Sequence, residues 1–231
     1  MSEPKAARMS PAGRQATRRS PESAAGESTE SDTRQRLIDA TVQCILEDGF
    51  YRASSNAIAE RAGLSWGVIQ YYFGSRENLM LTVLKEGTRL LVEELSTSQI
   101  EGDTLVDRIE SYLGIVDRYY GDPRYLAYVQ VMLNLSRDPK TSAQTMQTMI
   151  AVSKESEVQI RRLNTKVFSG ISLRNRSVRQ LVFTVLRGVA LSDSMTSALP
   201  FAASTLPSDR LTRHRLTAEA LSLLVEQYID R

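Results

Sequence analysis

The chain has 231 residues, 42% of them hydrophobic, and a single cysteine, so it can bury a sizeable core but cannot form an internal disulfide. Its formal net charge of only +2 argues against a protein that coats nucleic acid non-specifically. Few aromatic residues beside frequent Leu, Val, Ala and Met favour helices over sheets, which predicts an all-α fold.

The first segment, residues 1–30, is rich in Ser, Ala, Pro, Glu and Arg, and we expect it to be disordered. Residues 1–20 contain five basic residues and one acidic residue, a balance of +4. This basic arm either follows DNA in a minor groove or is a solvated tail, and the sequence leaves both open. It lacks the apolar stretch of a secretion signal, and no later run is long enough to span a membrane, so a cytoplasmic protein is expected.

A first helix is predicted from about Asp32 to Asp48, with Cys44 on its apolar stripe as a buried structural thiol. Two shorter helices follow between Ser54 and Phe73. Ser54 or Ser55 can cap the first of them, Gly63 supplies the left-handed turn that ends it, and Ser65 can cap the second. The pair is typical of a helix-turn-helix.

The second helix of this pair carries the side chains that would read DNA. Ile69 and Phe73 continue its buried face, which leaves other positions outward, toward the major groove. Tyr72 is expected to pack beneath and to offer its hydroxyl to a phosphate, while Gly67 allows close approach at a cost of up to about 1 kcal/mol. The outward positions are Trp66, Val68, Gln70 and Tyr71.

After Gly74, Ser75 caps a long helix that opens with Arg76. The whole region resembles the amino-terminal domain of the TetR family of bacterial transcriptional regulators. The resemblance covers about 50 residues and rests on the segments RQRLIDATVQCILEDGF, AIAERAGLS and YYFGSRENLM, in the family's order and spacing. It implies a DNA-binding head at residues 31–80 and a helical body at residues 81–231 that binds a small molecule and dimerises.

Three positions depart from the family pattern. Gln70 stands where members commonly have a tyrosine that meets a phosphate, and glutamine can instead reach an adenine edge. Trp66 replaces a residue that is often basic or small. Arg76 replaces the usual lysine and keeps a positive charge near helix-terminal amides suited to phosphate. Between Ser31 and Met80 there are five Arg and six Asp plus Glu, so selective contacts are expected to outweigh charge.

Asp-Pro pairs and glycines divide the body into further predicted helices. A fourth helix is expected to reach about Ser96, and a fifth to run from near Thr104 to Gly121. Asp122 and Asp138, each followed by proline, are expected to start the sixth and seventh. The last two long helices are apolar on more than one face, and the resemblance implies that their surplus faces form a homodimer, which would set two heads on a palindromic operator.

A pocket for a small, mainly apolar effector is expected among the body helices, because flexible Met and polar-tipped Tyr suit such ligands. Core packing is the alternative for each of these residues. The candidates are Tyr119, Tyr125, Tyr128, Val129, Met132, Leu133, Met146 and Met149.

Catalytic chemistry has little support in the sequence. The one histidine, His214, lies in a polar setting and is expected at the surface, and there is no second imidazole, cysteine cluster or phosphate-binding glycine motif. We therefore expect no cofactor, no metal and no enzyme activity. The interpretation is a DNA-binding regulator, with repression the family's usual mode. The alternatives are an architectural DNA-binding protein without a ligand and, less favoured, an all-helical enzyme.

Overall fold

The computed structural model describes residues 21–173, 175–198 and 209–229. Within these residues there are nine α-helices and no β-strand, which confirms the all-α fold class. The helices are α1 (Pro21–Asp48), α2 (Ser55–Arg61), α3 (Trp66–Phe73), α4 (Arg76–Thr97), α5 (Leu105–Tyr120), α6 (Arg124–Arg137), α7 (Ala143–Val167), α8 (Arg176–Ala198) and α9 (Arg210–Glu226).

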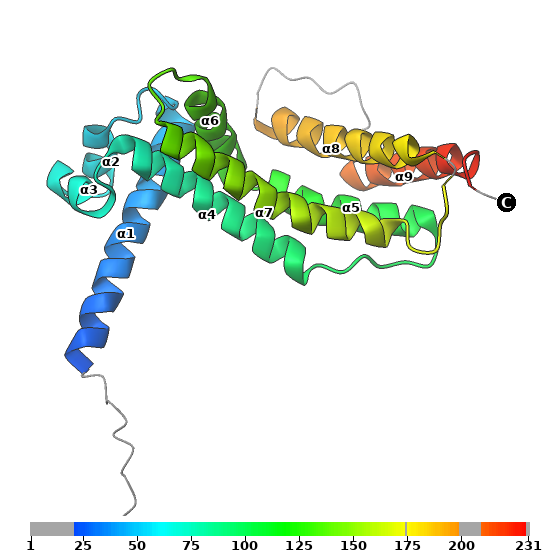
Figure 1. Cartoon of the computed structure of the whole chain (residues 1–231), viewed down its shortest axis with the longest axis horizontal. Coiled ribbons are helices and arrows are strands. Elements are labelled where there is room, and N and C mark those ends of the chain that lie inside the picture. The colour runs from blue at the N-terminus through cyan, green and yellow to red at the C-terminus, as the bar shows by residue number, and fades with distance from the viewer. Residues whose placement is uncertain (1–20, 174, 199–208, 230–231) are drawn as a thin grey trace, which may run out of the picture.

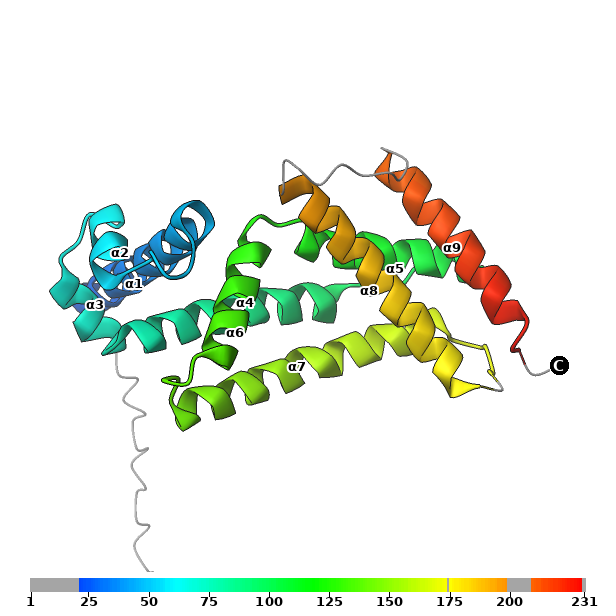
Figure 2. The same ribbon diagram turned by 90° about the horizontal axis from the view of Figure 1, so that it is seen from above.

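The molecule is elongated, with α2 and α3 at one end and α8 and α9 at the other (Figure 1). Helix α4 leads from the head into the body, and α7 runs beside it (Figure 2). At about 1.5 Å per residue, the 22 residues of α4 span about 33 Å. One rigid element therefore connects the head to much of the body.

Three of the local signals around the helix-turn-helix act as predicted, whereas Ser65 holds the N-cap position of α3 without a side-chain capping hydrogen bond. Ser54 caps α2 by accepting a hydrogen bond from the Ala57 amide at 3.2 Å, and Gly63 ends that helix with a φ of +65°. Ser75 caps α4 by accepting from the Asn78 amide at 3.1 Å. Because each of these devices is local, the sequence alone was enough to find them.

Two helix starts differ from the prediction. Helix α1 already begins at Pro21, so residues 21–30 are helical and not a disordered arm; Pro and Glu at its first positions suit a helix start. Residues 1–20, the basic arm, lie outside the described residues. Helix α7 begins after Ser142 instead of at Asp138, because the Asp138 carboxylate accepts from the Lys140 amide at 2.9 Å and holds a turn there.

The buried side chains form two hydrophobic clusters. The first joins α1, α2 and α3 to the first half of α4, to α6 and to Met149 of α7. The second joins Leu95 at the end of α4 to α5, α8, α9 and the last part of α7. The expected boundary at residue 80 therefore falls inside α4 and inside the first cluster, because the head shares its core with α6.

Arg76 fastens the head to α4. Its Nε donates to the Ala53 carbonyl at 2.8 Å, its Nη2 donates to the Phe50 carbonyl, and its guanidinium lies 4.6 Å from the centre of the Phe50 ring. The guanidinium is therefore used within the protein, and the phosphate contact that we expected of it stays a prediction. Burial lowers the pKa of Arg76. The two carbonyls stabilise the buried guanidinium by accepting hydrogen bonds from it.

Helix α6 makes a second connection to the same loop. The Phe50 amide donates to Oε1 of Gln130 at 3.3 Å, and α6 packs against both α1 and α4. Where α6 crosses α4, Gly87 allows close contact, because a Cβ added there would lie 2.5 Å from the Tyr128 ring.

None of the described helices combines the length and apolarity needed to cross a membrane.

We predict that Arg76→Ala lowers the free energy of unfolding by about 1.5–3 kcal/mol, the range for hydrogen bonds that involve a charged group. Arg76→Lys should not restore it, because one ammonium cannot reproduce the two carbonyl contacts and the stacking. Chemical denaturation followed by circular dichroism measures this. Arg52→Ala is the control: this exposed side chain should change stability by no more than about 0.5 kcal/mol. Equal effects of the two substitutions would contradict the anchoring role.

We predict opposite effects for two helical glycines. Gly87→Ala should destabilise by about 1–3 kcal/mol, since the new methyl group overlaps the buried Tyr128 ring. Gly114→Ala in α5, where an added Cβ meets nothing within 4 Å, should stabilise by up to about 1 kcal/mol through helix propensity. Thermal unfolding of the two variants provides the comparison, and a stabilised Gly87→Ala variant would contradict the close contact of α4 with α6.

Candidate DNA-binding face and ligand pocket

Helix α3 presents one face to solvent. Trp66 is 54% exposed and Tyr71 is 76% exposed, with Gly67 and Gln70 exposed beside them. Residues four apart share a helix face, so Trp66 with Gln70, and Gly67 with Tyr71, form one continuous strip. Ile69 and Phe73 are buried on the opposite side. The strip carries an indole, an amide and a phenol, which are groups that contact base edges and DNA backbone.

Two of the predicted contact residues lie deeper than this strip. Val68 is half-buried and packs against the first cluster, so the expectation that it points outward is wrong. Tyr72 also packs against that cluster, as expected, with its ring centre 6.3 Å from that of Phe73. Val68 and Tyr72 lie two and six residues after Trp66. At 3.6 residues per turn, both fall on the side of α3 that faces the core.

The three serines that were predicted to contact DNA differ in whether their hydroxyl groups are free to do so. The hydroxyl of Ser54 is used in the cap of α2, and Ser55, the first residue of α2, is half-buried. Ser65 holds the N-cap position of α3, but its side chain makes no capping hydrogen bond and the residue is exposed. Its hydroxyl can therefore meet an external acceptor such as a phosphate.

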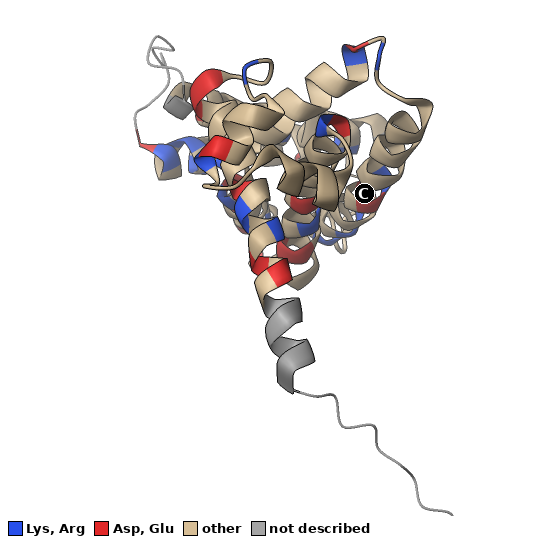
Figure 3. Ribbon diagram, turned by 90° about the vertical axis from the view of Figure 1, so that its left-hand side faces the viewer, with Lys and Arg blue, Asp and Glu red and all other residues tan. Residues whose placement is uncertain are grey.

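The head has no concentrated basic face. Arg61 pairs with Glu47 at 2.5 Å and with Asp48 at 3.5 Å, and Arg76 is turned into the protein. Arg52 is exposed, and acidic and basic positions alternate along the head end of the molecule (Figure 3). Charge alone therefore gives this surface little attraction for DNA.

A cavity of about 390 Å³ lies among α4, α5, α6, α7 and α8. It falls between the two hydrophobic clusters: Leu84, Tyr128 and Met149 on its wall belong to the first, whereas Leu91 and Ile160 pack against the second. The site therefore lies where the head-bearing half of the protein meets the half that contains α8 and α9.

Most of the predicted pocket residues line this cavity, and two do not. Leu133 is 45% exposed and Met146 is half-buried, and both lie outside the lining because they fall on other faces of α6 and α7. We did not predict Tyr120, Glu157 or Arg187, which the fold brings in. The predicted residues in the lining are Tyr119, Tyr125, Tyr128, Val129, Met132 and Met149.

Three tyrosines form an aromatic corner of the pocket. The ring centres of Tyr119, Tyr120 and Tyr125 lie 4.8–5.5 Å apart in edge-to-face arrangements, a geometry that aromatic rings favour. Burial raises the pKa of all three phenols. They are therefore neutral hydrogen-bond donors near neutral pH.

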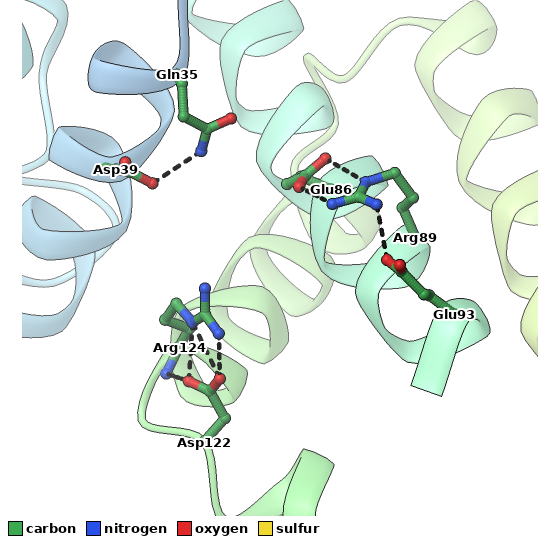
Figure 4. A network of polar contacts seen from close by, with 7 residues as sticks. All are labelled: Gln35, Asp39, Glu86, Arg89, Glu93, Asp122 and Arg124. Carbon is green, nitrogen blue, oxygen red and sulfur yellow. Dashed lines mark hydrogen bonds and ion pairs between the residues drawn. The ribbon is translucent and has the colours of Figure 1, made fainter. Parts of the chain in front are cut away.

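The polar contacts drawn near the junction of head and body are local ones. In Figure 4, Gln35 donates to Asp39 within α1, Arg89 pairs with Glu86 and Glu93 within α4, and Arg124 pairs with Asp122 beside α6. Each contact drawn stays within one helix or its adjoining turn. The head is held to the body by apolar packing, by the Phe50 loop and by Glu77 of α4, whose Oε1 accepts from the amide and the hydroxyl of Ser142 at 3.2 and 2.7 Å.

A buried polar cluster joins α5, α8 and α9. His214 is only 5% exposed, so its expected surface position is wrong: it lies 3.9 Å from Asp193, and burial lowers its pKa. Asp117, Asp193 and His214 each place one potential ligand atom within 4.8 Å of the others. Arg210 already pairs with Asp117 at 2.8 Å and Arg213 with Asp193 at 2.9 Å, so the charges are balanced without a metal ion.

Comparison with known proteins supports the assignment of the head. The family model of the bacterial regulatory proteins of the tetR family matches residues 37–83. The HTH-type transcriptional regulator BetI of Stenotrophomonas maltophilia is 34% identical over 90 residues, which cover 38% of this chain and 44% of that protein. The HTH-type transcriptional repressor AcnR of Corynebacterium glutamicum is 25% identical over 111 residues, covering 48% and 53%. The chain thus matches about half the length of these relatives.

The fold extends the likeness to the body. The crystal structure of the multidrug binding protein EbrR complexed with ethidium superposes with a TM-score of 0.54 over 84% of this chain and 98% of that chain, at 18% identity. At this identity the likeness concerns the fold alone. Residues 37–83 of the head thus match the bacterial regulatory proteins of the tetR family, and head and body together share the fold of this solved structure.

Proposed function

We propose that the protein is a sequence-specific DNA-binding transcriptional regulator, a repressor that a small and mainly apolar ligand releases from a palindromic operator. The observation that carries the proposal is the exposed strip of α3. Two neighbouring aromatic side chains, Trp66 and Tyr71, are exposed there, and an exposed apolar patch marks an interaction site. The names of the relatives, a transcriptional regulator and a transcriptional repressor, support the same function.

Dimerisation would follow from the surplus apolar surface of α8 and α9. Leu181 and Met195 on α8 are each 50% exposed, and on α9 Leu216 is 52% and Leu223 is 64% exposed. Apolar side chains at this spacing form stripes along both helices, and a second copy would cover them. Two-fold symmetry would then place two α3 helices on half-sites about 34–36 Å apart, or a multiple of it.

Ligand release would use the position of the pocket between the two hydrophobic clusters. Helix α6 lines the pocket through Tyr125, Tyr128 and Val129, and the same helix accepts the hydrogen bond from Phe50 through Gln130. A ligand that separates the clusters would therefore move α6 and α4, and with them the head. The ligand needs only to favour one of two head positions by its differential affinity.

The test is a selection of genomic DNA fragments bound by the full-length protein. A palindrome should be enriched, and Trp66→Ala and Gln70→Ala should each lose about 1–3 kcal/mol of discrimination at particular base positions. Arg52→Ala is the matched control, because loss of one exposed charge should weaken binding to all sequences alike and lower the salt slope by about 1. Failure to enrich any palindrome, or the same base preferences in all three variants and the wild type, would refute the proposal.

A further inference from the structure

One arginine belongs both to the pocket and to the groove outside it. Arg187, on α8, lines the cavity together with Tyr120 and Tyr125, and it also lines a groove between α7 and α8. Figure 2 shows α8 crossing over α7 in this region. Arg187 is exposed, and the walls of the cavity and of the groove share this residue.

The lining of the cavity carries one positive charge, that of Arg187, which no acidic residue of the lining neutralises. Glu157 is the one acidic residue among the described residues of the lining, and its carboxylate is paired with Arg161 at 2.6 Å. Within the described part of the chain Arg187 makes neither an ion pair nor a hydrogen bond through its side chain. A guanidinium with unused donors beside an apolar cavity favours an anion there.

The groove has the same sign. Its described lining contains Arg179 and Arg187, together with Arg161, which is paired with Glu157, and it contains no Asp or Glu. Arg179 lies with its guanidinium 5.1 Å from the centre of the Phe168 ring, so its charge is held beside the groove. A cleft lined by charge of one sign raises the local concentration of the opposite ion.

The other residues that line the cavity indicate the chemistry of the remainder of the ligand. Leu84, Leu91, Val152 and Ile160 supply aliphatic surface, and the tyrosine corner supplies aromatic surface and neutral hydroxyl donors. We propose that the ligand is an organic carboxylate with an apolar body, whose carboxylate binds Arg187 while its body fills the space between the two hydrophobic clusters. This inference rests on the ligand response proposed above and adds the charge and class of the ligand.

The test uses matched compounds that differ only in the head group: naphthoate, naphthylmethanol and naphthylmethylammonium, with decanoate, decanol and decylammonium as a second shape. Isothermal titration of the full-length protein should show one of the carboxylates binding about tenfold or more tighter than its alcohol, as expected for hydrogen bonds to a charged partner. The ammonium compounds should bind more weakly than the alcohols.

Variants then assign the preference to one residue. Arg187→Gln should reduce the preference for the carboxylate to about threefold or less and leave the affinity for the alcohol unchanged, whereas Arg187→Lys should retain part of it. Arg118→Gln, an exposed arginine of α5 that pairs with Glu94, is the matched control and should behave as wild type. Circular dichroism checks that each variant is folded.

The outcomes separate this inference from the function on which it rests. An alcohol or ammonium compound that binds as tightly as its carboxylate, or a preference that persists in Arg187→Gln, overturns the carboxylate assignment while the ligand response stands. A protein that binds its palindrome but takes up none of the compounds in the cavity overturns both. A protein that binds carboxylates through Arg187 without releasing DNA contradicts the proposed release and leaves the site intact.

Discussion

Helix α4 contributes apolar side chains to both hydrophobic clusters. Leu79, Met80 and Val83 are fully buried in the cluster that contains the head, and Leu95 is buried in the cluster that contains α8 and α9. Because protein interiors are close-packed and resist continuous deformation, α4 cannot tilt without changing its packing against one of the two. The geometry of the head relative to the body is thus set by how these clusters meet.

The cavity lies on that boundary, so a ligand bound as proposed would act on the contact between the two halves of the protein. Gly87 lets α6 approach α4 closely through Tyr128, and Tyr128 is also a wall of the cavity. Filling the space beside that ring would therefore act on the contact that fixes α6 against α4. The packed side chains, the Phe50 loop and the hydrogen bonds of Ser142 to Glu77 would carry the movement.

The sequence predicted what depends on neighbours in the chain and failed where distant segments meet. The caps at Ser54 and Ser75 and the turn at Gly63 have local signatures, so they could be predicted. Arg76 and His214 were assigned to DNA and to the surface because nothing nearby in sequence shows the Phe50 carbonyl or Asp193. Arg187 had no signal at all, since its helix was interpreted as a dimer helix and the tyrosines that it approaches lie on α5 and α6. Whether the strip on α3 contacts DNA remains a prediction.

The weak charge of the head also bears on how the protein would be switched. Arg61 and Arg76 are used within the protein, so few guanidinium groups remain to bind phosphates irrespective of sequence. The head by itself would then have low non-specific affinity, and its binding to an operator would depend on the fit of two α3 strips at a fixed separation. Under that condition a small shift of α4 suffices for release, because losing the fit at one half-site leaves little electrostatic attraction to hold the second. Under the proposed function, a head with little charge and a cavity at the cluster boundary would act together, and a modest difference in ligand affinity between two packings would be enough to control DNA binding.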